Sequence, residues 1–188
     1  MTNLLDVDWT TIPAPRDDGA ADHLPGTRLP AIALPATTGE QVDLSSLRGR
    51  SVIYAYPMTG RPDVPLPEGW DLIPGARGCT PQSCAFRDHA ADIASLGVAG
   101  LFGLSTQTTQ YQQEAAGRLH LPFPLLSDAD RLLSNALSLP VFEVEKEVLL
   151  KRLTLIVDDG VISKVFYPVF PPDRNADVVL DWLRRENS

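Results

Sequence analysis

Residues 75–88 read GARGCTPQSCAFRD and contain Cys79 and Cys84, the only two cysteines of the 188-residue chain. Two cysteines are too few for a disulfide framework. Their spacing also differs from the Cys-x-x-Cys of thioredoxin-type exchange proteins, and with His23, His89 and His120 far away in the sequence they form no zinc-ligand pattern. The pair is therefore expected to be either redox-active or chemically inert.

The sequence around the cysteines predicts one helix up to Gly97. Thr80 suits the N-cap, Pro81 suits the first helical position, and a glycine is common just after a helix end. Cys79 then lies immediately before the helix or in its first turn. Free N–H groups and the positive end of the helix dipole favour the thiolate there, so we expect Cys79 to be the nucleophile, with Arg77 adding positive charge.

Cys84 lies farther along the same predicted helix. Five residues of ideal helix correspond to about 7.5 Å of rise and about 500° of rotation, which places the two Cα atoms roughly 8.5 Å apart. Because a disulfide usually needs Cα atoms within about 7 Å, a Cys79–Cys84 bond requires the first turns to unwind. Pro81 makes unwinding easier, since it removes one backbone donor. Spacing alone leaves open that both cysteines are small buried hydrophobes.

The remaining sequence predicts an α/β fold, with a central mixed sheet flanked by helices on both faces. Residues 1–25 read as a loosely attached N-terminal arm on which Trp9 and Ile12 can dock, and residues 26–188 read as one domain. Buried strands are expected at 51–57 and 98–106. Other expected elements are a turn at Thr38-Gly39, a helix over 108–120, a helix start after Ser127, a terminal β-hairpin around Asp158-Asp159-Gly160, and an amphipathic closing helix with Val178, Val179, Trp182 and Leu183 inward.

The segment from Pro57 to Gly78 predicts a long loop, because nine of its twenty-two residues are Pro or Gly. Trp70 lies in its middle. Long ordered loops are often functional, so this one is either part of the site or a surface insertion.

The charge and composition limit the partners and cofactors that we expect. The formal charge is −8 and the pI is near 4.8, which disfavours nucleic acid and anionic membranes as partners. No secretory signal and no 18-residue apolar stretch is apparent, so a cytoplasmic protein is expected. No metal, flavin, haem or nucleotide site is visible in the sequence, and no cofactor is expected.

Four ordered segments resemble a known family. GCTPQSCAFRD at 78–88 closely resembles the Gly-Cys-Thr-x-x-x-Cys-x-Phe-Arg-Asp segment of peroxiredoxins of the bacterioferritin-comigratory-protein type, also called the Q type. LPAIALPATTGEQVDLSSLRGRSVIYAYP, PFPLLSD and KRLTLIVDDG resemble three further segments of that family. The resemblance implies a thioredoxin-like fold and reduction of hydrogen peroxide or organic hydroperoxides by a thiolate that becomes a sulfenic acid.

The resemblance also implies residue roles. Cys79 matches the peroxidatic cysteine, and Cys84 matches the resolving one, with which it forms an intrachain disulfide that thioredoxin or a glutaredoxin-like reductant reopens. Arg152 matches a strand arginine that stabilises the thiolate and orients the peroxide. Pro57 matches a proline that shields the cysteine. A monomer or a homodimer is compatible with these matches.

The chain departs from the family pattern in front of Cys79. Twenty-one residues separate Pro57 from Cys79, and Ala76 stands where the family has a threonine. Thr59 or, as the weaker candidate, Thr80 can replace the missing hydroxyl. Gln82 stands where a glutamate is often seen. Two rival functions therefore stay open, a thiol-disulfide reductase and a redox-sensing binding module.

Overall fold

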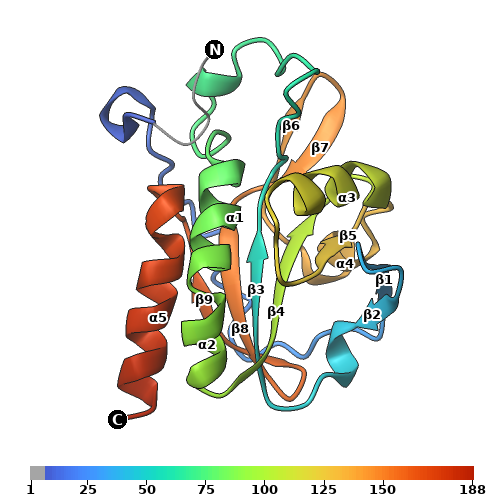
Figure 1. Cartoon of the computed structure of the whole chain (residues 1–188), viewed down its shortest axis with the longest axis vertical. Coiled ribbons are helices and arrows are strands. Elements are labelled where there is room, and N and C mark those ends of the chain that lie inside the picture. Colours follow the sequence, from blue (N-terminus) through green and yellow to red (C-terminus); the bar gives the residue numbers. More distant parts are fainter. Residues whose placement is uncertain (1–6) are drawn as a thin grey trace.

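The computed structural model describes residues 7–188, which fold around one mixed β-sheet (Figure 1). The strand order is β5-β4-β3-β8-β9, with β3, β4 and β5 parallel and β8 and β9 antiparallel to their neighbours. The bounds are β3 (Arg50–Ala55), β4 (Val98–Ser105), β5 (Leu125–Ser127), β8 (Leu153–Asp158) and β9 (Val161–Phe166). The predicted α/β architecture with a mixed sheet is confirmed.

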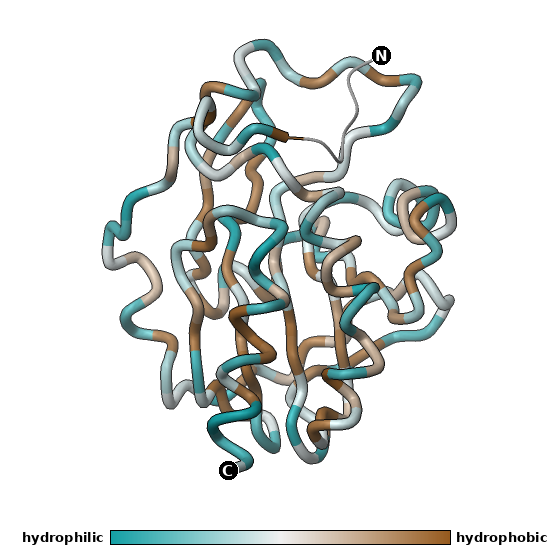
Figure 2. Tube along the Cα trace, turned by 60° about the vertical axis from the view of Figure 1, so that its left-hand side comes forward, coloured by the Kyte–Doolittle hydropathy of each residue, from teal (hydrophilic) through white to brown (hydrophobic). Residues whose placement is uncertain are grey.

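Alternate residues of β3 face two separate hydrophobic clusters, as the two-residue period of a strand requires. Val52 and Tyr54 belong to the cluster under α1 (Cys79–Asp88), α2 (Ala90–Ser95) and α5 (Asn175–Glu186), whereas Ile53 and Ala55 belong to the opposite cluster, which includes α4 (Leu132–Leu137). The helix α3 (Thr109–Arg118) packs beside β5. Figure 2 shows the hydrophobic strands inside this framework and hydrophilic segments outside it.

Two small hairpins complete the fold. β1 (Ala33–Pro35) and β2 (Gln41–Asp43) pair around the predicted Thr38-Gly39 turn. β6 (Val141–Val144) and β7 (Glu147–Leu150) form a second hairpin that the sequence analysis missed. Its turn residues Glu145 and Lys146 have φ angles of 48° and 77°. Glycine and asparagine are the residues typical of such turns, so the sequence Glu-Lys did not indicate one.

The helix predicted up to Gly97 is wrong in two respects. It breaks at His89, where φ is −101° and ψ is 5°, and gives α1 and α2 instead of one helix. The N-cap of α1 is Gly78, not Thr80, and Cys79 is the first helical residue. The closing helix also differs from its prediction in one position, since Val178 is 47% exposed while the neighbouring Leu180 is buried.

The description of the N-terminal arm as loosely attached is wrong for the residues that the structure describes. Ala21 and Leu24 are buried in the core. The imidazole Nε2 of His23 lies 2.8 Å from the carbonyl oxygen of Leu137, and Trp9 docks on the body as the sequence allowed. Residues 1–6 of the arm lie outside the described residues, and the domain boundary at residue 26 stays a prediction.

The long loop between β3 and α1 is confirmed. Its described residues form neither an α-helix nor a strand, apart from the short 3₁₀ turn η3 (Trp70–Leu72). Trp70 is 4% exposed and packs with Leu149 and Phe142 of the β6–β7 hairpin. The loop is therefore anchored against the body of the protein.

The remaining 3₁₀ turns are η1 (Trp9–Thr11), η2 (Leu44–Ser46) and η4 (Pro172–Arg174). Between residues 7 and 188 no helix combines the length and the apolar character that crossing a lipid bilayer demands.

Substitution by alanine is expected to reduce stability more at Gly160, in the terminal hairpin, than at Gly39, in the turn between β1 and β2. Gly160 has a φ of 78°, and a Cβ there would lie 2.6 Å from the Ser45 carbonyl oxygen, whereas Gly39 has a φ of 90° and open space around it. Gly39→Ala should cost about 1–2 kcal/mol, the left-handed backbone penalty. Gly160→Ala should cost at least about 2 kcal/mol more because a backbone contact must also shift. Urea unfolding of both variants measures the difference, and equal losses would contradict the packing described for Gly160.

Candidate active site

Cys79 lies at the amino end of α1 with its side chain 4% exposed. Gly78 caps the helix with a φ of 107°, and the first helical hydrogen bond runs from the Gln82 N–H to the Gly78 carbonyl at 3.0 Å. The N–H groups of Cys79 and Thr80 therefore precede the helical ladder. Free N–H groups at a helix start favour negative charge, so the position suits a thiolate.

Arg152 brings a positive charge to the sulfur. It precedes β8, is 3% exposed, and its Nη2 lies 3.3 Å from the Cys79 Sγ. The same nitrogen donates to three backbone carbonyls at 3.2–3.3 Å, those of Gly75, Ala76 and Arg77. These bonds fix the guanidinium against the turn that leads into α1.

The other partners of Arg152 in the described part of the chain carry no charge. Its Nη1 donates to the side-chain oxygen of Gln82, and the carbonyls above are also neutral. Burying a cation without a counter-charge is unfavourable. The sulfur of Cys79, when ionised, is the anion that this arrangement places in contact with the guanidinium.

A buried amide network orients Gln82. Its Nε2 donates to the Asn175 Oδ1 at 2.9 Å, and the Thr154 hydroxyl donates to the same oxygen at 2.7 Å. Because Asn175 takes the Gln82 amide nitrogen as donor, the amide oxygen of Gln82 faces Arg152. Gln82 thus keeps a hydrogen bond to the arginine at the position where the family often has glutamate.

Sequence reasoning missed Asn175 and Thr154. They belong to α5 and β8 and meet only because the closing helix packs on the sheet. Thr154 belongs to KRLTLIVDDG, one of the four segments that resemble the family, but a role was inferred there only for Arg152. Asn175 lies outside all four segments, so no local signal marked it.

A cavity of about 610 Å³ opens beside Cys79, and the long loop builds most of its wall. It is lined by Cys79, Thr80 and Pro81 of α1 and by loop residues that include Met58, Val64, Leu66, Trp70, Arg61 and Arg77. The two arginines form ion pairs within the loop, Arg61 with Asp63 at 3.0 Å and Arg77 with Asp71 at 2.5 Å. The charge of Arg77 is therefore shared with Asp71 rather than directed at the sulfur alone.

The candidate hydroxyl groups occupy different places. Thr80 lines the cavity next to Cys79. Thr59 is fully buried, and its hydroxyl and N–H both donate to the Gln107 Oε1, at 3.3 and 3.0 Å. Pro57 is buried just after β3 and is not among the residues that line this cavity. The structure brings Cys79, Arg152 and Thr80 together and leaves Pro57 and Thr59 outside the cavity wall.

Cys84 is a free thiol on the same helix and is 7% exposed. Burial raises the pKa of its thiol, while the nearby charge of Arg87 acts in the opposite direction. Cys84 is not among the residues that line the cavity beside Cys79. In the folded helix Cys84 is a buried neutral thiol that does not line the cavity beside Cys79.

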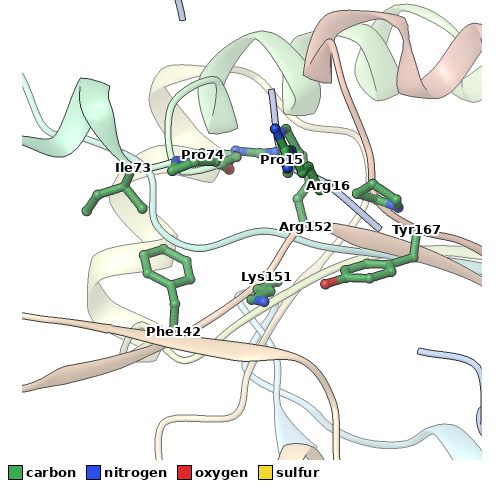
Figure 3. A pocket seen from close by; sticks show the side chains of 10 residues that line it. Pro15, Arg16, Ile73, Pro74, Phe142, Lys151, Arg152 and Tyr167 are labelled. Atoms are coloured by element: carbon green, nitrogen blue, oxygen red, sulfur yellow. The ribbon is translucent and has the colours of Figure 1, made fainter. Parts of the chain in front are cut away.

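Arg152 is not among the residues that line the cavity beside Cys79; it borders a separate cavity, of about 240 Å³ (Figure 3). Pro15 and Arg16 of the arm, Pro74 of the long loop, and Lys151 and Tyr167 contribute to its wall. The N-terminal arm therefore reaches the surroundings of the arginine. Among residues 7–188 no group of three or more His, Cys, Asp or Glu side chains is arranged to hold a metal ion.

Comparisons with known proteins agree with this arrangement. Residues 24–180 match the family model described as Redoxin. The chain is 32% identical to the putative peroxiredoxin bcp of Coxiella burnetii over 82% of this chain and 95% of that protein. It is 30% identical to peroxiredoxin Bcp of Escherichia coli K12 over 85% of this chain and 94% of that protein.

Solved structures show the same fold. Peroxidoxin BcpB of Mycobacterium tuberculosis superposes with a TM-score of 0.71 at 27% identity, covering 88% of this chain and all of that one. The bacterioferritin comigratory protein of Xanthomonas campestris, a protein with alkyl peroxide reduction activity, superposes with a TM-score of 0.68 at 22% identity, covering 85% of this chain and 97% of that one. The thioredoxin-like fold is confirmed, and the chain belongs to the Redoxin family, within it to the peroxiredoxins of the bacterioferritin-comigratory-protein, or Q, type.

Proposed function

We propose that the chain is a thiol-dependent peroxidase in which Cys79 is the peroxidatic residue. The observation that carries the proposal is the 3.3 Å contact between the buried Arg152 guanidinium and the Cys79 sulfur, at a helix start and beside a cavity. A positive group in contact with the sulfur stabilises the thiolate, which is the nucleophilic form.

In the first step the thiolate attacks one peroxide oxygen and the O–O bond breaks. The sulfur becomes a sulfenic acid, so it loses two electrons to the peroxide, and the departing oxygen takes a proton to leave as water or an alcohol. Arg152 and the free N–H groups at the start of α1 stabilise the negative charge that shifts from sulfur to oxygen. Thr80, which lines the cavity, supplies the hydroxyl that binds the peroxide in place of the one absent at Ala76.

In the second step Cys84 resolves the sulfenic acid. Its thiolate attacks the Cys79 sulfur, an S–S bond forms, and the hydroxyl leaves as water after protonation. Because five helical residues separate the two, this step follows unwinding of the start of α1. Unwinding also exposes Cys84 to water, which removes the burial that raises its pKa.

A dithiol reductant then supplies two electrons and reopens the disulfide. We infer thioredoxin or a glutaredoxin-like protein as the class of reductant, and a cytoplasmic monomer or homodimer as the working form. The shielding role assigned to Pro57 stays a prediction.

The cavity accommodates organic hydroperoxides as well as hydrogen peroxide. Its volume of about 610 Å³ far exceeds the roughly 30 Å³ that a water-sized molecule occupies in liquid. Met58, Val64, Leu66 and Trp70 give it an apolar wall for an alkyl group. The alkyl peroxide reduction named for the Xanthomonas neighbour supports this choice of substrate.

Peroxide consumption and intact mass test the assignment of the two cysteines. With one equivalent of cumene hydroperoxide, the parent should lose two hydrogens and form a 79–84 disulfide, and Cys84→Ser should gain one oxygen on Cys79. Cys79→Ser should consume hydroperoxide at least about 100-fold more slowly than the parent, because no nucleophile remains. Equal consumption by Cys79→Ser overturns the proposal, and insulin reduction without peroxide consumption indicates a thiol-disulfide reductase instead.

The two candidate threonines make a matched pair. Thr80→Val should lower kcat/KM for hydroperoxide about tenfold, the factor that one lost hydrogen bond to the reacting oxygen corresponds to. Thr59→Val should leave kcat/KM within about twofold, because the Thr59 hydroxyl bonds Gln107 and lies outside the cavity wall. The reverse order of effects excludes Thr80 as the substrate hydroxyl.

Alkylation of the reduced protein separates the two thiols by pH. Iodoacetamide should label Cys79 first, while Cys84 labelling should become appreciable only above the ordinary thiol pKa of about 8.5, since burial raises the Cys84 pKa and the thiolate fraction grows with pH. Arg152→Gln should slow labelling of Cys79 about tenfold or more by removing the contacting charge. Arg50→Gln, which changes an arginine paired with Asp158, serves as the control. Peptide mapping measures both sites, and faster labelling of Cys84 at neutral pH contradicts the assignment.

A further inference from the structure

Gly78, the residue immediately before Cys79, is enclosed by two rings. A Cβ at Gly78 would lie 2.6 Å from the Pro172 Cγ and 2.7 Å from the Trp9 Cη2. The positive φ of 107° and this lack of space both require glycine. Trp9 and Pro172 therefore pack directly on the backbone that must move when α1 unwinds.

Trp9 is held in this place by its own contacts. Its indole Nε1 donates to the Asp173 Oδ2 at 2.9 Å, and its ring meets the Phe170 ring edge-on with centroids 6.0 Å apart. Asp8 caps the short turn η1 by accepting from the Thr10 N–H at 3.0 Å, which fixes the backbone around Trp9. These contacts fix the position of the Trp9 side chain against Gly78.

Asp173 depends on Trp9 in return. The Oδ1 of Asp173 is buried and has no hydrogen-bond partner among the described residues, so the indole N–H is the donor that the carboxylate has there. A partly buried carboxylate with one solvent-inaccessible oxygen is destabilised when it loses its donor. Moving Trp9 away would therefore cost its packing on Gly78 and Phe170 and would leave the Asp173 carboxylate without its hydrogen-bond donor.

We propose that Trp9, held by Asp173, is a positioning residue for the peroxidatic turn. It keeps the start of α1 folded around Cys79 for the reaction with peroxide, and it leaves Gly78 when the Cys79–Cys84 disulfide forms. The inference rests on the proposed two-cysteine function. Trp9 lies outside residues 24–180, the part that matches the family model, so this contact is an addition that the N-terminal arm makes to the site.

Fluorine NMR of protein labelled with 5-fluorotryptophan tests the release. The chain has three tryptophans, and Trp9→Phe identifies the resonance of Trp9. One equivalent of hydrogen peroxide should shift this resonance in the parent, which forms the disulfide, and leave it in place in Cys84→Ser, which stops at the sulfenic acid. The resonance of Trp182, which packs on Phe166 and Arg50, is the internal control and should not move.

Rapid quenching with intact mass separates positioning from general stability. Trp9→Phe keeps a ring but removes the bond to Asp173, and it should speed disulfide formation from the sulfenic acid about tenfold without speeding the peroxide step. A variant that is merely destabilised would show no gain in the ratio of the two rates. Trp182→Phe, as the matched control, should change neither rate.

The two experiments distinguish failure of the positioning role of Trp9 from failure of the two-cysteine mechanism. A disulfide that forms while the Trp9 resonance and the rate ratio stay unchanged overturns the positioning role and leaves the peroxidase intact. A parent protein that forms no disulfide overturns the resolving role of Cys84 and the inference with it.

Discussion

The contact between the guanidinium of Arg152 and the sulfur of Cys79 is the constraint around which the rest of the site is arranged. A cation that is 3% exposed is costly unless its hydrogen bonds are satisfied and a counter-charge is near. Backbone carbonyls of the turn before α1 and the amide of Gln82 accept from the two terminal nitrogens without adding charge, while the buried Nε has no partner among the described residues. The charge therefore remains available to the thiolate.

The fold holds these groups at one end of the central sheet. β8 begins next to Arg152, and α1 begins with Cys79, so both depend on the alignment of β3 with β8 and on the packing of α5. Asn175 on α5 connects the two elements through Gln82 and Thr154. The long loop then encloses the approach to the sulfur, and its last residues supply the carbonyls of Gly75, Ala76 and Arg77 that accept from Arg152.

The sequence was informative where chemistry is local. The segment around the cysteines placed Cys79 next to or within the first turn of a helix, although the N-cap is Gly78 and not Thr80. The resemblance of KRLTLIVDDG to the family pointed to Arg152, whose guanidinium contacts the Cys79 sulfur. Three features without a local signal were missed. The break at His89 lies where the imidazole contacts Asp177 of α5 at 3.0 Å, a residue remote in sequence. The Glu145-Lys146 turn takes positive φ angles without glycine, and Val178 faces outward on its helix.

The choice between Thr59 and Thr80 shows the same limit. Thr59 lies nearer to Pro57 in sequence and was the stronger candidate, but the loop turns its hydroxyl toward Gln107. Motif spacing describes order along the chain, and the long segment of twenty-one residues between Pro57 and Cys79 breaks the link between that order and position in space.

The packing of the arm has a practical consequence for defining the smallest working protein. A fragment cut to residues 24–180 would retain both cysteines and Arg152. It would lose Ala21 and Leu183 from the core and Trp9 from the turn before Cys79. In this chain the region that matches the family model is shorter than the region whose side chains build the two hydrophobic clusters, and expression designs should follow the second.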